Sequence, residues 1–268
     1  MKIRIKKIYN IIIFVWIKNF FEKIRILKTI RDFRLKKVKY RMSNFFSEFI
    51  KEGDLVFDVG ANVGVYSEVY LNLGAKVVAI EPQKNCVRYL NHIFQNNQNL
   101  VVIEKALGEK EGNGELLISP TNDAHSSMSR QWLSAAKESG RFADQNYFIF
   151  NKPVEVQITT LNLLIEKYGT PRFIKIDVEG FEHEVLRGLT KPVEAISFEF
   201  HPEFLDEMKK CILYLEKLGN YYFNFSLGDS FKLELSNYVA GGRLIDNILN
   251  LPNKSVHGDI YCQLQCKI

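Results

Sequence analysis

The sequence predicts an α/β fold, a doubly wound and mostly parallel Rossmann-like sheet. Short apolar runs rich in Val, Ile and Phe recur from about residue 54 onward. Segments with helical periodicity separate these runs, and acidic residues close several of them. Such runs suit strands that are buried on both faces of a parallel sheet, and their alternation with helices is typical of βαβ units.

Each expected element follows from this periodicity. Strands are predicted at 55–60, 77–82, 101–108, 173–178 and 195–200, and helices at 63–73, 86–97, 160–168 and 182–189. After about residue 219, the runs YYFNFSL and DIYCQLQC predict two more strands, separated by a loop-like stretch with Gly241, Gly242 and Pro252. Because no convincing helix lies between them, we expect an antiparallel pair at the edge of the sheet.

Two regions interrupt the alternation and divide the chain. Residues 109–158 contain the strand-like GELLIS and VEVQIT around a polar, irregular middle. This exceeds the usual length of a connection, so we expect an insertion. The chain is therefore predicted to comprise a basic amphipathic helical arm at 1–45 and one domain at 46–268 that carries the insertion.

The N-terminal arm differs from the domain in charge. Residues 1–41 hold 14 Lys and Arg against Glu22 and Asp32, a net charge of +12, which leaves 5 − 12 = −7 for the rest. A basic amphipathic helix can lie on an anionic membrane surface, or it can pack its apolar face on the domain, and both interpretations stay open. No nucleic-acid motif accompanies the charge, so we expect no nucleic-acid partner.

The expected location is the cytoplasm, with peripheral contact on the inner face of the membrane as an option through residues 1–41. The apolar run Ile11–Ile17 ends at Lys18, far short of the ~20 residues that span a bilayer. No small-residue cleavage site follows it, which argues against a signal peptide. The four cysteines form no CxxC pair and are expected to be reduced.

The segment VFDVGANVGVYSEVYLNLGAKVVAIEP, residues 56–82, predicts a ligand-binding edge. Asp58 closes a strand, Gly60 permits a tight turn, and Gly64 is expected to let the helix approach the strand closely. Glu81 closes the next strand, where a carboxylate can accept both hydrogen bonds of a ribose diol, and Pro82 stiffens the exit. In an open α/β sheet, ligands bind beyond the carboxyl ends of the strands.

Two cofactor classes use this arrangement, and charge favours one of them. A dinucleotide site wants GxGxxG, but Asn62 replaces the second glycine. Asp58 would repel a pyrophosphate, whereas it suits a ligand that carries an ammonium group. S-adenosylmethionine has that ammonium, a sulfonium and an adenosine diol for Glu81, so the sequence favours the methyl donor over NAD.

With these motifs the chain resembles the FkbM-type family of class I S-adenosylmethionine-dependent methyltransferases. The resemblance covers residues of about 50 to 205 and rests on VFDVGANVGVYS, IEP, TTLNLLIEKYG, FIKIDVEGFEHEVLRGL and ISFEFHPE. It implies methylation of hydroxyl groups on sugars or small secondary metabolites. It also implies a cofactor site lined by Asp58, Gly60, Ala61, Asn62, Gly64, Glu81 and Pro82, with Ala106 facing the adenine.

A second acidic group follows the expected strand at 173–178. Asp177 and Glu179 are two residues apart, so in a strand both could point into the cleft. A base near a sugar hydroxyl would help methyl transfer by ~10²–10⁴-fold, and we expect Asp177 or Glu179 to orient the acceptor or take its proton. A structural salt bridge, for example with Lys175 or Arg187, is the alternative. Glu182 and Glu184 are expected to serve as helix-capping acids.

His201 follows the fifth strand in SFEFHPEF and is an alternative catalytic base. Asp177, Glu199 and His201 could also hold a divalent metal such as Mg²⁺. Magnesium prefers oxygen ligands, so a metal is not favoured and no metal ligands are predicted. His125, Ser126, Ser127 and Arg130 in the insertion are candidates for lid or acceptor contacts, or for a solvated loop.

The predicted function is an O-methyltransferase that acts on a hydroxylated small molecule or glycan acceptor, with a sugar of a surface glycan or its precursor as the expected substrate. The catalytic candidates are Asp177, Glu179 and His201. One alternative is an NAD-dependent oxidoreductase, which the replacement at Asn62 and the lack of a convincing Tyr-x-x-x-Lys pair disfavour. The other is a catalytically idle Rossmann-like binding module.

Overall fold

The computed structural model describes residues 36–118, 126–139, 153–253 and 256–265. In the order of the chain its strands and α-helices are as follows, with two short 3₁₀ turns at Pro202–Phe204 and Gly228–Ser230. They are α2 (Lys36–Phe46), β1 (Leu55–Val59), α3 (Val65–Asn72), β2 (Lys76–Ile80), α4 (Lys84–Ile93), β3 (Leu100–Ile103), β4 (Ala106–Leu107), β5 (Gly112–Leu116), α5 (Arg130–Glu138), β6 (Val154–Thr159), α6 (Leu161–Tyr168), β7 (Phe173–Ile176), α7 (Glu182–Arg187), β8 (Ala195–Phe200), α8 (Leu205–Leu218), β9 (Tyr221–Leu227), α9 (Gly241–Leu249) and β10 (Gly258–Leu264).

The main sheet confirms the predicted fold class. Its strand order is β3-β2-β1-β7-β8-β10-β9, with parallel pairing from β3 to β8 and antiparallel pairing of β10 with both β8 and β9. The chain runs outward from β1 to β3 and then returns to β7 on the other side of β1. Strand order therefore reverses between β1 and β7, which is where doubly wound sheets bind ligands.

Alternation along the strands builds a separate core on each face of this sheet. Phe57 and Val59 of β1 pack in the core that α6, α7, α8 and α9 cover. Val56 of the same strand faces the core formed with α2 and α3. The end of the predicted arm belongs to this second core, because Met42, Phe45 and Phe46 of α2 are buried there. The remainder of the arm, residues 1–35, lies outside the described residues.

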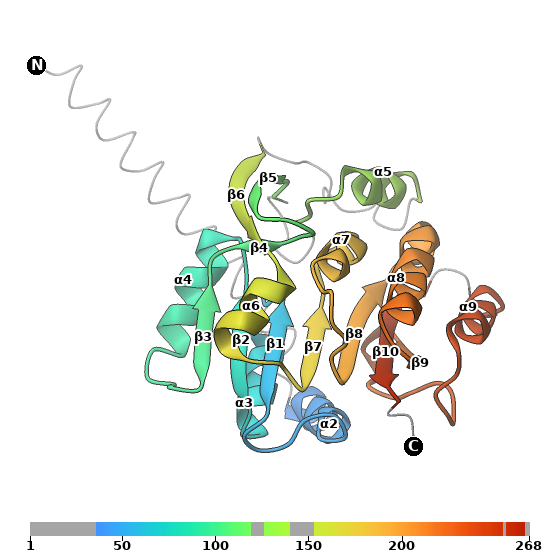
Figure 1. Ribbon diagram of the computed structural model, residues 1–268, viewed down its shortest axis with the longest axis horizontal. Helices are drawn as coiled ribbons and strands as arrows, with labels where there is room; N and C mark the ends of the chain where they lie inside the picture. The colour runs from blue at the N-terminus through green and yellow to red at the C-terminus, as the bar shows by residue number, and fades with distance from the viewer. Residues whose placement is uncertain (1–35, 119–125, 140–152, 254–255, 266–268) are drawn as a thin grey trace, which may run out of the picture.

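A second, three-stranded sheet lies over the carboxyl ends of the main strands, together with α5 (Figure 1). Its order is β4-β6-β5, and β5 is antiparallel to β6. The predicted strand at 101–108 is therefore wrong as a single element, because β3 stays in the main sheet and β4 leaves it to pair with β6. The insertion is thus a cap over the edge where ligands bind.

Three helices were not among those predicted from the sequence: α5, α8 and α9. The expectation of a loop between the last two strands was wrong, since α9 begins at Gly241. Gly241 fits there because a Cβ atom would lie 2.4 Å from the Ile212 side chain of α8. Gly241 therefore reflects close helix–helix packing, whereas a Cβ atom at Gly242 would meet nothing within 4 Å. Within the described residues, no helix is long and apolar enough to cross a membrane.

Candidate active site

A cavity of about 350 Å³ opens at the point where strand order reverses. One side is formed by the turn after β1, Gly60 to Val63, and by the residues that follow β2, Glu81 to Gln83. The other side comes from the loop after β7 and from Glu199 of β8. Ala106 and Leu107 of β4, with Leu116 and Met128 of the insertion, add apolar surface above them. A concave site with an apolar wall and converging polar groups is typical of a small-molecule site.

Gly60 makes the turn after β1 possible in two ways. Its φ of +81° lies in the left-handed region, and a Cβ atom would lie 1.8 Å from the backbone oxygen of Asp177. No side chain fits that space, so the β1 turn and the β7 loop touch through their backbones. Asn62 also has a positive φ, of 48°, which is uncommon for a residue other than glycine. The turn is therefore held in an unusual conformation at the cavity wall.

Glu81 is fixed in the cavity by this turn. One carboxylate oxygen accepts a hydrogen bond from the backbone N–H of Asn62 and the other from that of Gln83, both at 2.8 Å. Only 3% of Glu81 is exposed. The two backbone hydrogen bonds hold the Glu81 carboxylate rigidly in the wall of the cavity.

Two residues predicted to line the cofactor site lie outside the lining of the cavity. Asp58 is buried and accepts a hydrogen bond of 2.5 Å from the Ser67 hydroxyl of α3. Gly64 begins α3, and a Cβ atom there would lie 2.4 Å from the Leu90 side chain of α4. The expected reason for Gly64 was therefore wrong: it lets α3 approach α4, whereas the expectation was close contact with the strand. Gly60, Ala61, Asn62, Glu81, Pro82 and Ala106 do line the cavity.

Lys175 is a buried cation between acidic side chains. Its strand β7 pairs with β1 so that Lys175 lies directly beside Asp58, and its ammonium donates to Asp177 at 2.6 Å. The same ammonium lies 4.2 Å from the centre of the Tyr66 ring, a cation–π contact. Burial alone would lower the pKa of Lys175, but Asp177, Asp259 and Asp58 raise it. Lys175 is therefore charged at neutral pH.

Asp177, the acidic partner of Lys175 in this ion pair, lines the cavity. Burial alone would raise the pKa of Asp177, but the Lys175 ammonium holds it below its ordinary value. The salt bridge weighed as an alternative thus exists, and Asp177 lines the cavity at the same time. An ionised carboxylate at this place can accept a hydrogen bond from a bound hydroxyl.

Glu179 reaches the cavity by a route that strand alternation did not predict. β7 ends at Ile176, and Glu179 lies in the following loop with a φ of 56°. Its backbone oxygen accepts a hydrogen bond of 2.6 Å from the hydroxyl of Ser127 in the insertion. Such strained positions persist where surrounding contacts determine them, and they occur often at functional sites.

Glu182 shapes the same loop. Its carboxyl accepts hydrogen bonds from the backbone N–H groups of Val178 and Gly180, at 3.2 and 3.1 Å. Burial raises the pKa of Glu182 to about 8, although the nearby His201 and the hydrogen bonds from the backbone N–H groups of Glu182 and Gly180 oppose the shift. Glu182 does bind backbone N–H groups at the start of α7, as a capping acid would. These N–H groups, however, belong to the loop that precedes the helix.

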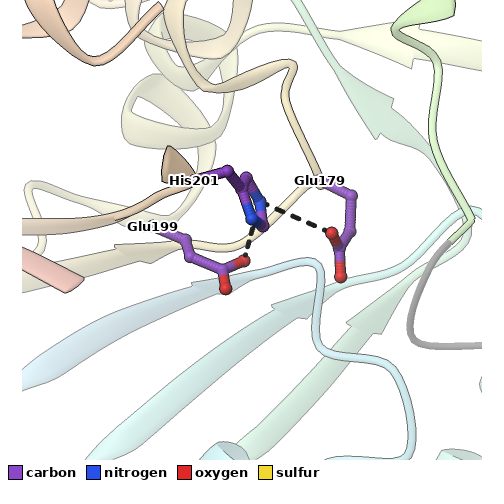
Figure 2. Close-up of side chains that lie close together, drawn as sticks. All are labelled: Glu179, Glu199 and His201. Atoms are coloured by element: carbon purple, nitrogen blue, oxygen red, sulfur yellow. Dashed lines mark ion pairs between the residues drawn. The ribbon is translucent and has the colours of Figure 1, made fainter. Parts of the chain in front are cut away.

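Three side chains meet at the acidic end of the cavity: Glu179, Glu199 and His201 (Figure 2). The Nε2 atom of His201 lies 3.5 Å from a Glu179 carboxylate oxygen and 3.4 Å from a Glu199 carboxylate oxygen. His201 is buried behind the two glutamates and lies outside the lining of the cavity, whereas both glutamates line it. The ring of Trp132 in α5 packs against the imidazole, with 5.1 Å between the ring centres.

The C-terminal strands contribute groups that the sequence did not single out. Gly228, Asp229, His257 and Asp259 line the cavity, and Asp259 pairs with Glu199 across β10 and β8. Burial, and then Asp177 and Glu179, raise the pKa of Glu199 well above its ordinary value. Burial raises the pKa of Asp259 to about 6, against the effect of Lys175. Asp259 could have been found only by placing β10 between β8 and β9 in the sheet. The register of β10 with β8 then brings Asp259 beside Glu199.

A profile of the FkbM methyltransferase domain matches residues 58–222 of the chain. The protein belongs to this methyltransferase family. The matched region runs from the end of β1 through β8 and α8, and it includes the glycine turn, Glu81 and the Glu179–Glu199–His201 cluster.

Individual relatives are more distant. Hexuronic acid methyltransferase AglP from Haloferax volcanii is 24% identical over 177 residues, which cover 63% of this chain and 62% of that protein. The chain therefore spans less than two thirds of that relative. Among solved structures, precorrin-6y C5,15-methyltransferase from Geobacter metallireducens is 11% identical, with a TM-score of 0.45 over 86% of this chain and 90% of that one. A putative methyltransferase from Streptococcus mutans in complex with SAH is 10% identical, with a TM-score of 0.41 over 83% and 95%.

Proposed function

We propose that this member of the FkbM family is an S-adenosylmethionine-dependent O-methyltransferase that acts on a hydroxyl group of a sugar, in a surface glycan or its precursor. The observation that carries the proposal is the carboxylate of Glu81, fixed by two backbone N–H groups at the mouth of a cavity with an acidic wall opposite. Family membership supports a methyl donor over NAD.

The cavity fits the methyl donor along its length. Glu81 offers acceptor positions for a ribose diol, and Ala106, Leu107 and Leu116 offer an apolar surface for an adenine ring. The backbone of the Gly60 turn and the ionised Asp177 lie beyond them, where a cationic end would be stabilised. When bound, S-adenosylmethionine supplies a methyl group on a positively charged sulfur.

The remaining groups suit a hydroxyl acceptor. Asp177 is kept ionised by Lys175 and lines the cavity, so it can accept a hydrogen bond from the acceptor and orient it. Glu179 lines the same wall. His201 supports Glu179 and Glu199 from behind, which makes it a positioning residue and not the group that meets the acceptor. The sugar as substrate is supported by the name of the distant relative AglP.

The test is methyl transfer from labelled S-adenosylmethionine to a panel of sugars that includes hexoses, amino sugars and hexuronates. We expect label in a sugar ether that survives mild alkali, which a methyl ester does not. Alkali-labile label would contradict O-methylation of a hydroxyl and favour ester formation on a carboxylate. No transfer by a protein that binds the donor would favour the idle binding module.

We also retain as a proposal that the protein is cytoplasmic and that residues 1–41 contact the inner face of the membrane. Its support is the net charge of +12 in the sequence of this segment. A protein that lacks residues 1–35 keeps α2 and its buried Met42 and Phe45. We expect it to lose sedimentation with anionic liposomes and to keep its donor affinity. Unchanged sedimentation would contradict the membrane role.

A further inference from the structure

We infer that Glu179, Glu199 and His201 form a binding site for a divalent cation at the acceptor end of the cavity. One ligand-capable atom of each residue lies within 4.8 Å of those of the other two. An imidazole nitrogen with two carboxylates is a donor set that Zn²⁺ and Mn²⁺ accept in proteins. The sequence did not favour a metal, because magnesium prefers oxygen ligands and the candidate set of Asp177, Glu199 and His201 contains an imidazole. In the structure Asp177 pairs with Lys175, and Glu179 takes its place in the cluster.

The separations within the cluster are those of ligands around one ion. Two ligand atoms each about 2.1 Å from a tetrahedral ion are about 3.4 Å apart. His201 Nε2 lies 3.5 Å and 3.4 Å from the oxygens of Glu179 and Glu199. An N–H···O hydrogen bond is shorter, about 2.7–3.2 Å. The two carboxylates are at most 4.8 Å apart, so a bound ion would draw them closer together.

The charge of the surroundings also favours a cation. Asp259 lies beside Glu199 across β10 and β8, and Asp177, Glu179, Glu199 and Asp259 all line this end of the cavity. Lys175 is the buried ammonium facing this group, and it already donates to Asp177. Closely spaced buried carboxylates are costly unless a cation compensates them.

Contacts with the insertion hold two of the ligands in place. Glu179 keeps its positive φ while the Ser127 hydroxyl donates to its backbone oxygen. Trp132 packs on the His201 ring, and a Cβ atom at Gly180 would lie 2.4 Å from Trp132. Both contacts come from the insertion, Ser127 and Trp132, so the insertion supports the cluster directly. Three protein ligands beside a cavity leave a coordination position open, as in catalytic metal sites.

The role of the ion rests on the proposed O-methyl transfer, whereas its binding does not. The ion would hold the acceptor oxygen and lower the pKa of its hydroxyl. The acceptor oxygen then gains the bond to the methyl carbon, and the electron pair of the broken carbon–sulfur bond stays on sulfur. The hydroxyl proton passes to the ionised Asp177 and from there to solvent. Charge and atoms balance with no further reactant.

The test is calorimetric titration of the full chain, freed of metal by chelation, with Zn²⁺, Mn²⁺ and Mg²⁺ as separate probes. We expect one equivalent of at least one ion to bind at micromolar concentration. Glu199→Gln and His201→Gln should each weaken it at least tenfold. Glu207→Gln, which changes a buried carboxylate of α8 outside the cluster, should leave it unchanged.

Absence of binding for all three ions in the folded wild-type chain would overturn the proposal. Binding that survives both cluster substitutions would overturn it as well, since the ion would then sit elsewhere. If His201→Gln does not fold, the comparison of Glu199→Gln with the wild type is sufficient to test the site. Titration with S-adenosylhomocysteine in parallel separates the two proposals: a chain that binds the cofactor product but no ion refutes the metal site and leaves the methyltransferase standing.

Discussion

The two walls of the cavity differ in how the chain builds them. The donor wall, defined as residues 59–63 and 81–83, comes from one β-α-β unit, and its one lining carboxylate, Glu81, is held by backbone N–H groups. The acceptor wall, defined as residues 177–179, 181, 199, 228–229, 257 and 259, comes from distant segments and gathers several carboxylates around Lys175. Local backbone geometry organises the donor wall, whereas electrostatic balance organises the acceptor wall.

The backbone contact between the two walls gives the largest expected effect. Gly60→Ala would place a Cβ atom 1.8 Å from the Asp177 oxygen, at a φ of +81°. We expect a loss of about 4–5 kcal/mol in the free energy of unfolding, from overpacking and backbone strain together. Urea denaturation measures it. Gly53→Ala is the control, because Gly53 has a φ of +85° with nothing within 4 Å, and it should cost about 1 kcal/mol. Equal losses would show that the two walls do not touch as described.

Removing the cation of the acceptor wall comes next. Lys175→Met leaves Asp58, Asp177 and Asp259 without their buried partner, and we expect a loss of about 3–4 kcal/mol at pH 7. The loss should shrink as the pH falls toward 5, because protonated carboxyls no longer need the ammonium. Denaturation at several pH values measures it, with the exposed Lys76→Met as control. A loss that does not depend on pH would argue for packing instead of charge.

The contribution of Glu182 to stability depends on pH in the opposite direction to that of Lys175, because it is lost as the pH rises. Burial raises its pKa in the folded state to about 8, above the value of the unfolded chain. A group with a raised pKa contributes stability that is full below its unfolded pKa and is lost as the pH rises toward 8. Glu182→Gln imitates the protonated form, so the free energy of unfolding should fall less between pH 5 and 8.5 in the variant. Parallel curves for the two proteins would refute the assignment.

The smallest effect tests the link between the insertion and the acceptor wall. Ser127→Ala removes the hydrogen bond to the Glu179 backbone oxygen, and we expect a loss of about 1–2 kcal/mol. Methyl transfer should fall at least tenfold while the affinity for S-adenosylhomocysteine stays the same. Ser139→Ala, which removes the bond to the Ala136 oxygen at the end of α5, should change neither property. Equal activity of the two variants would show that the contact between the insertion and the acceptor wall does not affect methyl transfer.

The same contrast explains what the sequence could and could not predict. The strand, turn and acid of the donor wall follow one another in the chain, so spacing alone was enough to single out Gly60, Asn62 and Glu81, which line the cavity. Asp58 lies outside the cavity lining, because spacing cannot tell whether a side chain at a strand end faces the cavity or, as here, Ser67 beneath it; its place in the cofactor site stays a prediction. Asp259 reaches the acceptor wall only through the register of β10 with β8, which requires the order of the strands.

Helices were missed where packing, and not local pattern, determines them. α9 begins with two glycines, which disfavour a helix locally, yet its Leu244 and Ile248 are buried against the sheet. The direction of the His201 side chain likewise could not be read from the sequence: the residue follows the predicted strand, but its imidazole lies behind the glutamates that line the cavity, and its role as a base stays a prediction.

The most direct test of the account is calorimetric titration with S-adenosylmethionine and S-adenosylhomocysteine on the wild type, Glu81→Gln and Glu104→Gln. Glu104 follows β3 as Glu81 follows β2, but it does not line the cavity, which makes it a matched control. The account predicts micromolar binding by the wild type and Glu104→Gln, and at least tenfold weaker binding by Glu81→Gln. Binding that Glu81→Gln leaves unchanged, or none by the folded wild type, would contradict the donor site.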